Sequence, residues 1–253
     1  MNGTSKLLRV TSNDLSNSSH GTDTDLDFRT NDGDLHQIHR VLLKTVIFPN
    51  TFYNINKYNN YIGVVGDDME PVGPIEMGQY NLSQYIASLI EVLNVASAPH
   101  TFTVVQDPIT RKLMFTKSGG DEFTLLGKKD GNRQWRESGC KETVTSEGLV
   151  AFTSAIPDLS GLRHVYIESL IAGAQILTGD VNKYSILADF PISVPFGAYQ
   201  TIEYDEHTMN QVTYRGAKQL SKFDLRFTDD QNRELDLNGL DWFLVFECHG
   251  VGT

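Results

Sequence analysis

Short strand-like runs separated by turn-forming residues dominate this sequence, and they restrict its fold more than any other feature. Residues 24–29 alternate apolar and polar side chains, and residues 36–55 (HQIHRVLLKTVIFPNTFYNI) are dense in apolar and β-branched residues. Alternation indicates a strand with one buried face, and a continuous apolar run indicates a strand buried on both faces. Further strand-like runs follow Glu142 without helices between them. Many short strands without alternating helices favour an antiparallel β-sandwich or jelly roll over a parallel α/β sheet.

One segment has helical periodicity instead. Residues 81–94 (NLSQYIASLIEVLN) repeat apolar side chains at helical spacing, and Asn81 or Ser83 can cap the start of the helix. Two strand-like runs joined by a turn at residues 107–111 follow it. We therefore predict a small α+β insertion at residues 73–139, between two parts of a jelly roll at residues 21–72 and 140–253. The alternative is one continuous domain with a long decorated loop.

The first twenty residues are polar and rich in Ser and Asn, which predicts a flexible arm at residues 1–20 that becomes ordered only against a partner. They lack the charged-then-apolar order of a secretory signal, and no apolar run is long enough to cross a bilayer. Cys140 and Cys248 are the only cysteines, fewer than a secreted disulfide scaffold carries. We expect two unpaired thiols, no membrane span and synthesis in a reducing cytoplasm.

The acidic stretch near the end of the chain poses the question of a metal site. Residues 229–239 (DDQNRELDLNG) lie between two apolar runs and include Asp229, Asp230 and Asp236. The spacing of a calcium-binding loop is absent, whereas Asp and Asn side chains commonly bond nearby backbone donors in turns. Asn238-Gly239 is a further turn signal because both residues tolerate positive φ. We predict a meander of turns and strands here, and no metal ligands.

No constellation of catalytic residues emerges from the remaining sequence. His36 and His39, preceded by Asp32 and Asp34, have a spacing that points them to opposite faces of a strand, which disfavours a shared zinc ion. Cys140 and His164 form only a weak thiolate pair hypothesis, and the glycine and serine motifs of phosphate-binding and hydrolase sites are absent. The predictions are therefore no catalytic residues, no cofactor and no metal.

Charge disfavours one class of function and leaves one local basic patch to consider. The formal net charge is −11, whereas a protein that coats nucleic acid is normally basic, so direct genome wrapping is disfavoured. The densest group of basic residues comprises Lys128, Lys129, Arg133 and Arg136, and the acidic residues Asp130 and Glu137 lie in the same stretch of sequence. Arg133, Trp135 and Arg136 can stack on bases or sugars, although a solvated loop is the simpler prediction.

The segment at residues 189–197 (DFPISVPFG) is expected at the edge of a sheet. Pro191 and Pro195 each fix φ and lack a backbone donor, which excludes them from the centre of a sheet. Residues 205–210 are polar and are expected to form an outer loop. For both segments, a contact between subunits and an ordinary loop at the rim of the sheet are equally good interpretations.

Four segments, in this order along the chain, carry a resemblance to a known group of proteins. They are VLLKTVIFPNTFYNINKYNN (residues 41–60), IEMGQYNLSQYIASLIEVLN (75–94), RKLMFT with EFTLLG (111–116 and 122–127), and GLRHVYIESL (161–170) followed by FPISVPFG and the closing meander (190–197 and 225–247). In these segments the chain resembles the minor capsid, or penton, proteins of Polinton/Maverick elements, adintoviruses and mavirus-like virophages.

The resemblance implies an all-β fold, a single jelly roll with a small α+β insertion. It further implies a structural virion protein that forms the vertex capsomer of an icosahedral capsid as a homopentamer, beside a major capsid protein with a double jelly roll. Two other hypotheses remain open from the residues. One is a carbohydrate-binding β-sandwich for host attachment, motivated by Trp135 and the acidic composition, and the other is a jelly-roll enzyme that acts on glycans or depends on a metal.

Overall fold

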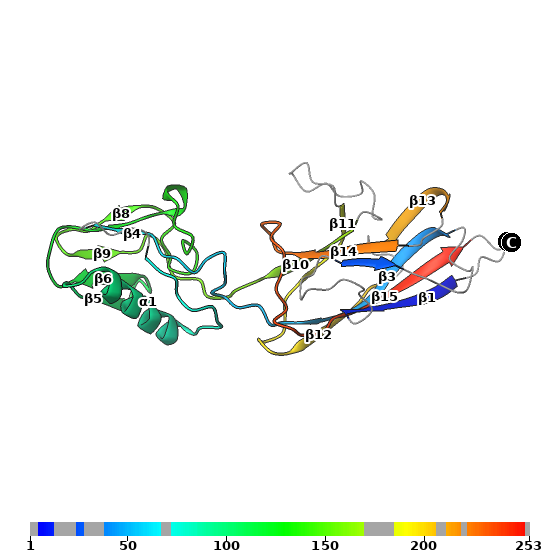
Figure 1. The fold of residues 1–253 in the computed structure, drawn as a ribbon, viewed down its shortest axis with the longest axis horizontal. Helices are drawn as coiled ribbons and strands as arrows, with labels where there is room; N and C mark the ends of the chain where they lie inside the picture. Colours follow the sequence, from blue (N-terminus) through cyan, green and yellow to red (C-terminus); the bar gives the residue numbers. More distant parts are fainter. Residues whose placement is uncertain are drawn as a thin grey trace. The chain divides into compact units, whose positions relative to one another are not determined.

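The chain forms two compact units in a computed structural model, which describes residues 5–12, 24–27, 38–66, 72–169, 185–205, 211–218 and 222–250. One unit consists of Met1–Phe52 and Leu162–Thr253, and the other of Tyr53–Gly161 (Figure 1). The second unit is thus an insertion in the first. It extends beyond residues 73–139, the limits that composition indicated, because flanking residues such as Ile55, Ile62 and Ala151 belong to its hydrophobic core.

The first unit contains a five-stranded antiparallel sheet, which we call the first sheet. Its strand order is β1 (Ser5–Thr11), β15 (Phe243–Gly250), β3 (Ile38–Pro49) and β12 (Tyr199–Glu203), and β13 (Gln211–Lys218) also pairs with β3. β12 lies along residues 45–49 of β3 and β13 along residues 38–42, so two shorter strands share one long partner. β3 is therefore a central strand, which agrees with its long apolar run.

A second antiparallel sheet completes this unit. Its order is β11 (Ser185–Pro191), β10 (His164–Ser169), β14 (Lys222–Thr228) and β2 (Thr24–Asp27). The ladder between β10 and β11 shifts register between Ile167 and Glu168. Both sheets are built from strands that are distant in sequence, as a jelly roll requires.

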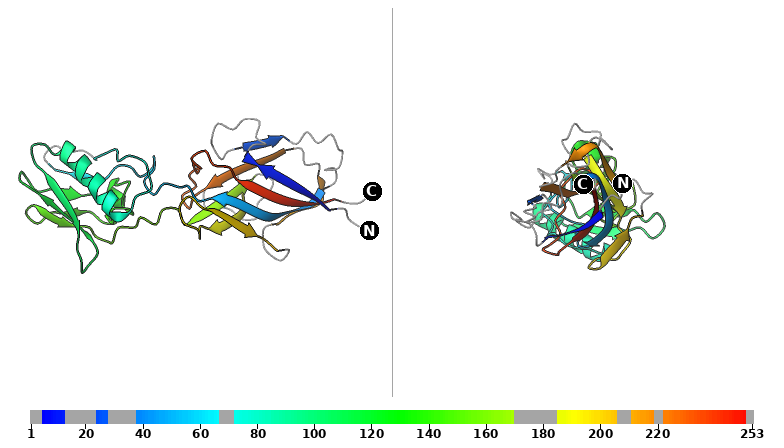
Figure 2. Two further views of the ribbon diagram at one scale, coloured as in Figure 1. Left: turned by 90° about the horizontal axis from the view of Figure 1, so that it is seen from below. Right: turned by 90° about the vertical axis from the view of Figure 1, so that its right-hand side faces the viewer.

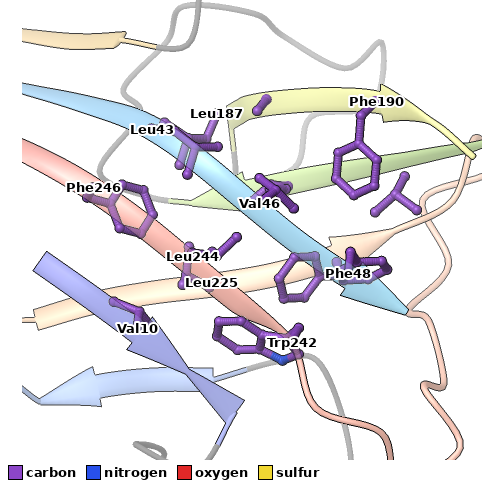
Figure 3. Packing of buried hydrophobic residues seen from close by; sticks show 14 of the residues in the cluster. Val10, Leu43, Val46, Phe48, Leu187, Phe190, Leu225, Trp242, Leu244 and Phe246 are labelled. Carbon is purple, nitrogen blue, oxygen red and sulfur yellow. The ribbon is translucent and has the colours of Figure 1, made fainter. Parts of the chain in front are cut away.

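The two sheets bury their facing side chains in one aromatic-rich core (Figure 3). The Phe48 ring of β3 lies 5.5 Å from Phe190 of β11 and 4.9 Å from Phe227 of β14, measured between ring centroids. Trp242, just before β15, lies 5.0 Å from Phe227. Burying each of these rings contributes about 2–3 kcal/mol. Two antiparallel sheets packed in this way confirm the predicted all-β jelly roll.

The first residues of the chain differ from the predicted flexible arm. Residues 5–11 form β1, which pairs with β15 from Ser5 opposite His249 to Thr11 opposite Phe243. Val10 is fully buried in the core between the two sheets, and Leu8 packs against it. Two apolar side chains at alternate positions therefore anchor this segment, although the polar composition around them obscured the strand. Residues 1–4 and 13–20 of the predicted arm lie outside the described residues.

The described residues of the inserted unit form one α-helix and two small sheets. Figure 2 shows both units from further directions. The helix α1 (Leu82–Ala96) buries Tyr85, Leu89 and Leu93 and lies against β5 (Phe102–Gln106). β5 pairs with β6 (Leu113–Lys117), which pairs with β9 (Val150–Phe152). The other sheet contains β4 (Val64–Val65), β7 (Thr124–Leu125) and β8 (Val144–Thr145), and a 3-10 turn, η3 (Lys128–Asp130), follows β7.

A capping box begins the helix. The Asn81 side chain accepts a hydrogen bond from the backbone N–H of Gln84, and the Gln84 side chain accepts one from the backbone N–H of Asn81. This arrangement satisfies two donors that a helix start leaves without partners. Of the two caps that the sequence allowed, Asn81 is the one used.

One buried asparagine joins the two ends of the inserted unit. The Asn54 side chain accepts from the backbone N–H of Tyr80 and donates to the carbonyl oxygens of Tyr80 and Leu159, at 2.9, 2.8 and 3.0 Å. The unit begins at Tyr53, directly before Asn54, and it ends at Gly161, two residues after Leu159. Hydrogen bonds therefore connect residues near the start and the end of the unit, in addition to the packing of its core.

Candidate functional site

The acidic stretch after β14 is a set of turns held by its own side chains. Asp229 Oδ1 accepts from the backbone N–H groups of Gln231 and Arg233 at 2.8 and 2.9 Å, and Asp229 Oδ2 lies 2.6 Å from the Arg233 guanidinium. Asp236 Oδ1 accepts from the Asn238 N–H at 2.9 Å. Asn232 and Asn238 adopt positive φ. The interpretation of this stretch as turn chemistry is confirmed.

The returning part of that stretch is less regular than expected. A single bridge joins Thr228 and Glu234, and residues 235–242 form no strand. Leu235 and Leu237 are nevertheless buried in the jelly-roll core. The alternation of apolar residues therefore indicated burial correctly, but β15 supplies the backbone pairing only from Phe243 onward.

Of the two histidines considered as zinc ligands, His36 and His39, the structure describes only His39. His36, like Asp32 and Asp34, lies outside the described residues. His39 instead lies near His249 of β15, with ring centroids 6.5 Å apart, and His249 Nε2 lies 3.4 Å from Glu247 Oε1. Within the described part of the chain, no three His, Cys, Asp or Glu side chains gather closely enough to hold a metal ion.

The two residues of the thiolate hypothesis belong to different units. Cys140 is buried in the core of the inserted unit, whereas His164 is exposed on β10 of the jelly roll. Burial raises the pKa of the Cys140 thiol to about 11. A thiol with this pKa is almost entirely protonated at neutral pH and is a poor nucleophile. The Cys248 thiol, in the jelly-roll core, has its pKa raised to about 11, also by burial.

The basic group occupies a loop of the inserted unit, where its cations contact aromatic rings. Lys128 Nζ lies 4.6 Å from the centroid of Trp135, and Arg136 Cζ lies 5.5 Å from the same ring. Arg133 Cζ lies 5.8 Å from the centroid of Tyr61, a partner that sequence spacing did not indicate. Because two cations already contact Trp135, the ring is less available to stack on a neutral sugar or a base than the sequence allowed.

The proline-containing segment lies at the edges of both sheets, as expected. β11, an edge strand of the second sheet, ends at Pro191, and β12, paired with the outer part of β3, begins at Tyr199. Between them the Gly197 N–H donates to the Asn50 carbonyl, and the Asn50 side chain donates to the Val194 carbonyl. This rim exposes Tyr199, which remains 48% accessible.

The outer face of the first sheet is apolar at one end and ionic at the other. Its side chains form rows across the strands: Thr11, Phe243, Ile47 and Thr201; Arg9, Val245, Thr45 and Glu203; Leu7, Glu247, Leu42 and Gln211; and Ser5, His249, Arg40 and Thr213. Phe243, Ile47 and Val245 are half-buried, and Leu7 is 67% exposed. At the ionic end Lys44 lies 3.8 Å from Glu247, and Arg40 donates to Gln211.

The outer face of the second sheet is ionic where it is described. Glu168 is buried beside Arg226 at 3.4 Å, and burial raises the pKa of its carboxyl above the ordinary value. Tyr166 is surrounded by carboxylates. Burial, followed by the charges of Asp189, Asp230 and Asp229, raises the pKa of its hydroxyl. The two outer faces of the jelly roll therefore differ in chemistry, a contrast that only the strand register reveals.

Comparison with known proteins finds a likeness in structure but none in sequence. No family model and no curated protein matches this chain. Among solved structures, the mavirus penton protein is similar, with a TM-score of 0.50 and 13% sequence identity, over 98% of this chain and 100% of that chain. A chain of the Sputnik virophage structure matches with a TM-score of 0.42 and 11% identity, over 97% of this chain and 98% of that chain.

The first of these matches confirms the resemblance at the level of the fold. It spans the jelly roll and the inserted unit together, because almost the whole of both chains is aligned.

None of the helices in the described ranges has the length and apolar character of a membrane span.

Proposed function

We propose that this chain is a structural virion protein that forms the vertex capsomer of an icosahedral capsid. In this proposal five copies assemble into a ring, and the ring sits beside a major capsid protein with a double jelly roll. The chain acts in the virion after synthesis in the host cytoplasm. It has no catalytic role, and it contributes structure instead of wrapping the genome.

The observation that supports this proposal best is the extent of the likeness to the mavirus penton protein. Jelly rolls occur in proteins of many functions, so a shared jelly roll alone supports little. Here the likeness covers 98% of this chain, which includes a 109-residue insertion at Tyr53–Gly161 as well as the jelly roll. An insertion of this size in the same fold is a far more specific feature than the sandwich.

The outer face of the first sheet supports self-association. Side chains on the outer face of a solvated sheet are usually polar, yet Phe243, Val245, Ile47 and Leu7 lie there on adjacent strands. Isolated exposed apolar residues are ordinary, whereas a group of them, rimmed by polar residues, is typical of protein interfaces. A second copy of this chain is the partner that a ring supplies.

The direct test is the mass and shape of the purified protein. Native mass spectrometry is expected to show a species of five times 28.3 kDa, and negative-stain images are expected to show rings with fivefold symmetry. Co-expression with a major capsid protein extends the test to shells. A protein that stays monomeric at high concentration and never enters shells would contradict the proposal.

A charge placed on the apolar end of the outer face tests the interface separately. Ile47→Asp, whose cross-strand neighbours Phe243 and Thr201 carry no charge, buries an unpaired carboxylate if this face is covered by another copy. The cost is about 3 kcal/mol or more per contact, which is over a hundredfold in affinity. The oligomer is expected to dissociate while the monomer stays folded. Thr103→Asp, on an exposed position of β5, is the control and is expected to leave the oligomer intact.

A further inference from the structure

Cations concentrate in one loop of an otherwise acidic unit. We define the basic loop as residues 127–141, which hold five of the nine Lys and Arg residues of the inserted unit: Lys128, Lys129, Arg133, Arg136 and Lys141. Lys128, Lys129, Arg133 and Lys141 are exposed. The whole chain carries a formal charge of −11, so this concentration runs against the charge of its surroundings.

Hydrogen bonds made by buried polar side chains fix the backbone of the basic loop. The Asn132 side chain donates to the Leu126 carbonyl and accepts from the Gln134 N–H, at 2.8 and 2.9 Å. Gln134 Oε1 accepts from the Tyr85 hydroxyl at 2.8 Å, and the Ser138 hydroxyl donates to the Gln134 carbonyl at 2.6 Å. Asn132, Gln134 and Ser138 are all buried. These three buried side chains therefore anchor the loop, and Arg133, between two of them, is exposed.

A close backbone approach locks the far end of the same loop. Gly139 has a φ of +79°, and its backbone N–H donates to the Arg136 carbonyl at 3.2 Å. A Cβ atom at this position would collide with the carbonyl oxygen of Ala155. Only glycine fits here, because it tolerates both the positive φ and the contact. The loop thus presents its cations without a large ordering cost when a ligand binds.

Aromatic rings, which carry no charge, contact three of the five cations of the basic loop. Lys128 and Arg136 contact Trp135, and Arg133 contacts Tyr61. A cation placed over a ring is oriented by the ring quadrupole and keeps its net charge. The exposed Lys128 ammonium over Trp135 can therefore still act on a bound anion.

The acidic residues within the loop are engaged with the protein's own donors. Asp130 Oδ2 accepts from the Thr143 hydroxyl, and Glu137 Oε1 accepts from the Asn59 side chain at 2.8 Å. Glu137 is half-buried, as its contact with the buried Asn59 requires. These contacts hold the two carboxylates on the protein, while Lys128 and Lys129 of η3 are exposed.

We propose that the basic loop binds an acidic saccharide and recognises its carboxylate or sulfate groups by charge. A sugar polymer with repeated carboxylate or sulfate groups suits a loop that presents several cations on an anchored backbone. Single-stranded nucleic acid fits less well, because proteins bind it through bases stacked on aromatic rings, and the rings here already contact cations. This binding function goes beyond a role in the shell and does not depend on it.

The test is a binding titration of the full-length protein with a labelled heparin fragment, with neutral dextran and a single-stranded oligonucleotide as comparison probes. The wild-type protein is expected to bind heparin, and its affinity is expected to fall as salt screens the charges. K128Q/K129Q is expected to lower the affinity roughly tenfold, because each exposed cation contributes about 0.7 kcal/mol. K128R/K129R keeps both charges and is expected to retain binding.

A matched control removes two cations elsewhere in the same unit. Arg111 and Lys112 lie in the β5–β6 turn, and Arg111 has a φ of +60°, which Asn also tolerates. R111N/K112Q is expected to change heparin affinity by less than about twofold if net charge alone has a small effect. Equal losses in both double variants, no binding to heparin, or tighter binding to the oligonucleotide than to heparin would each overturn the proposal.

Discussion

The jelly roll and the inserted unit satisfy their buried polar groups in opposite ways. The longest strands of the jelly roll span twelve and eight residues, and their backbone groups pair in ladders. The strands of the inserted unit span two to five residues, which leaves much of its backbone in loops. Buried amide and hydroxyl side chains such as Asn54, Asn132 and Ser138 form hydrogen bonds with the backbone of those loops.

The difference teaches what each unit depends on for stability. Buried backbone groups need partners, and a unit with short strands must find them in side chains. The jelly roll should therefore be most sensitive to loss of apolar volume, and the inserted unit also to loss of a single amide. The chain offers a convenient report on each, since Trp242 lies in the jelly roll and Trp135 in the inserted unit, and there are only two tryptophans.

The largest effect is expected from Phe48→Ala in the jelly-roll core. Removing this ring leaves a cavity between the two sheets, and the free energy of unfolding is expected to fall by about 3–5 kcal/mol. Urea unfolding followed through Trp242 fluorescence, in a Trp135→Phe background, measures the loss. The Trp135 signal, recorded in a Trp242→Phe background, is expected to be unchanged. An equal shift of both signals would show that the two units unfold as one.

A smaller effect, confined to the other unit, is expected from Asn54→Ala. The substitution removes the partners of one backbone N–H and two carbonyl groups, which costs about 2–3 kcal/mol of unfolding free energy. Trp135 fluorescence during urea unfolding is the readout. Asn50→Ala removes the hydrogen bond that the Asn50 side chain donates to the Val194 carbonyl in the jelly roll. It serves as the control, since it should shift only the unfolding transition that Trp242 reports. Reversed effects would refute the contrast between the units.

The helix cap predicts a loss of about 1 kcal/mol for Asn81→Ala, again in the inserted unit alone. The reason is that the Gln84 N–H loses its acceptor while the packing of the helix is retained. Ser83→Ala is the matched control, because Ser83 is exposed within the first turn and does not cap the helix. Thermal unfolding of both variants measures the difference. A greater loss for Ser83→Ala would show that the cap is misassigned.

The smallest effect concerns pH and the jelly roll. Burial raises the folded-state pKa of Glu168 above its ordinary value, so the folded protein holds this proton more tightly than the unfolded chain. The contribution of Glu168 to stability is therefore present below the unfolded pKa and is lost as pH rises through the folded pKa. Glu168→Gln is expected to gain stability relative to wild type over that rise, measured by urea unfolding at several pH values. A difference that stays constant with pH would contradict this assignment.

Periodicity predicted the parts of the fold in which burial follows local pattern. The alternating run that starts at residue 24 is a strand over its described residues, Thr24–Asp27. The alternating run at residues 223–227 and the continuous run at residues 38–49 are strands, and the helical spacing after Asn81 is a helix. The edge position of the segment with Pro191 also followed from backbone chemistry, because proline has no N–H to donate. The turn chemistry of Asp229 and Asp236 followed from their short carboxylate side chains.

Features that depend on residues distant in sequence did not follow from pattern. β1 was hidden because only Leu8 and Val10 mark it, and its partner β15 lies more than two hundred residues away. The limits of the inserted unit were drawn too narrowly because its flanks look like connections until Asn54 is seen to bond Leu159. Tyr61 beside Arg133 is a partner of the same kind.

The sequence by itself determined the class of fold, the helix with its cap, and the turns, since each arises from neighbouring residues and their backbone preferences. Only the tertiary structure decided the register of the sheets, and with it the side on which each side chain lies. A shift of one residue moves every side chain of a strand to the opposite face. The apolar outer face of the first sheet and the aromatic partners of the basic loop therefore exist only once distant segments are brought together.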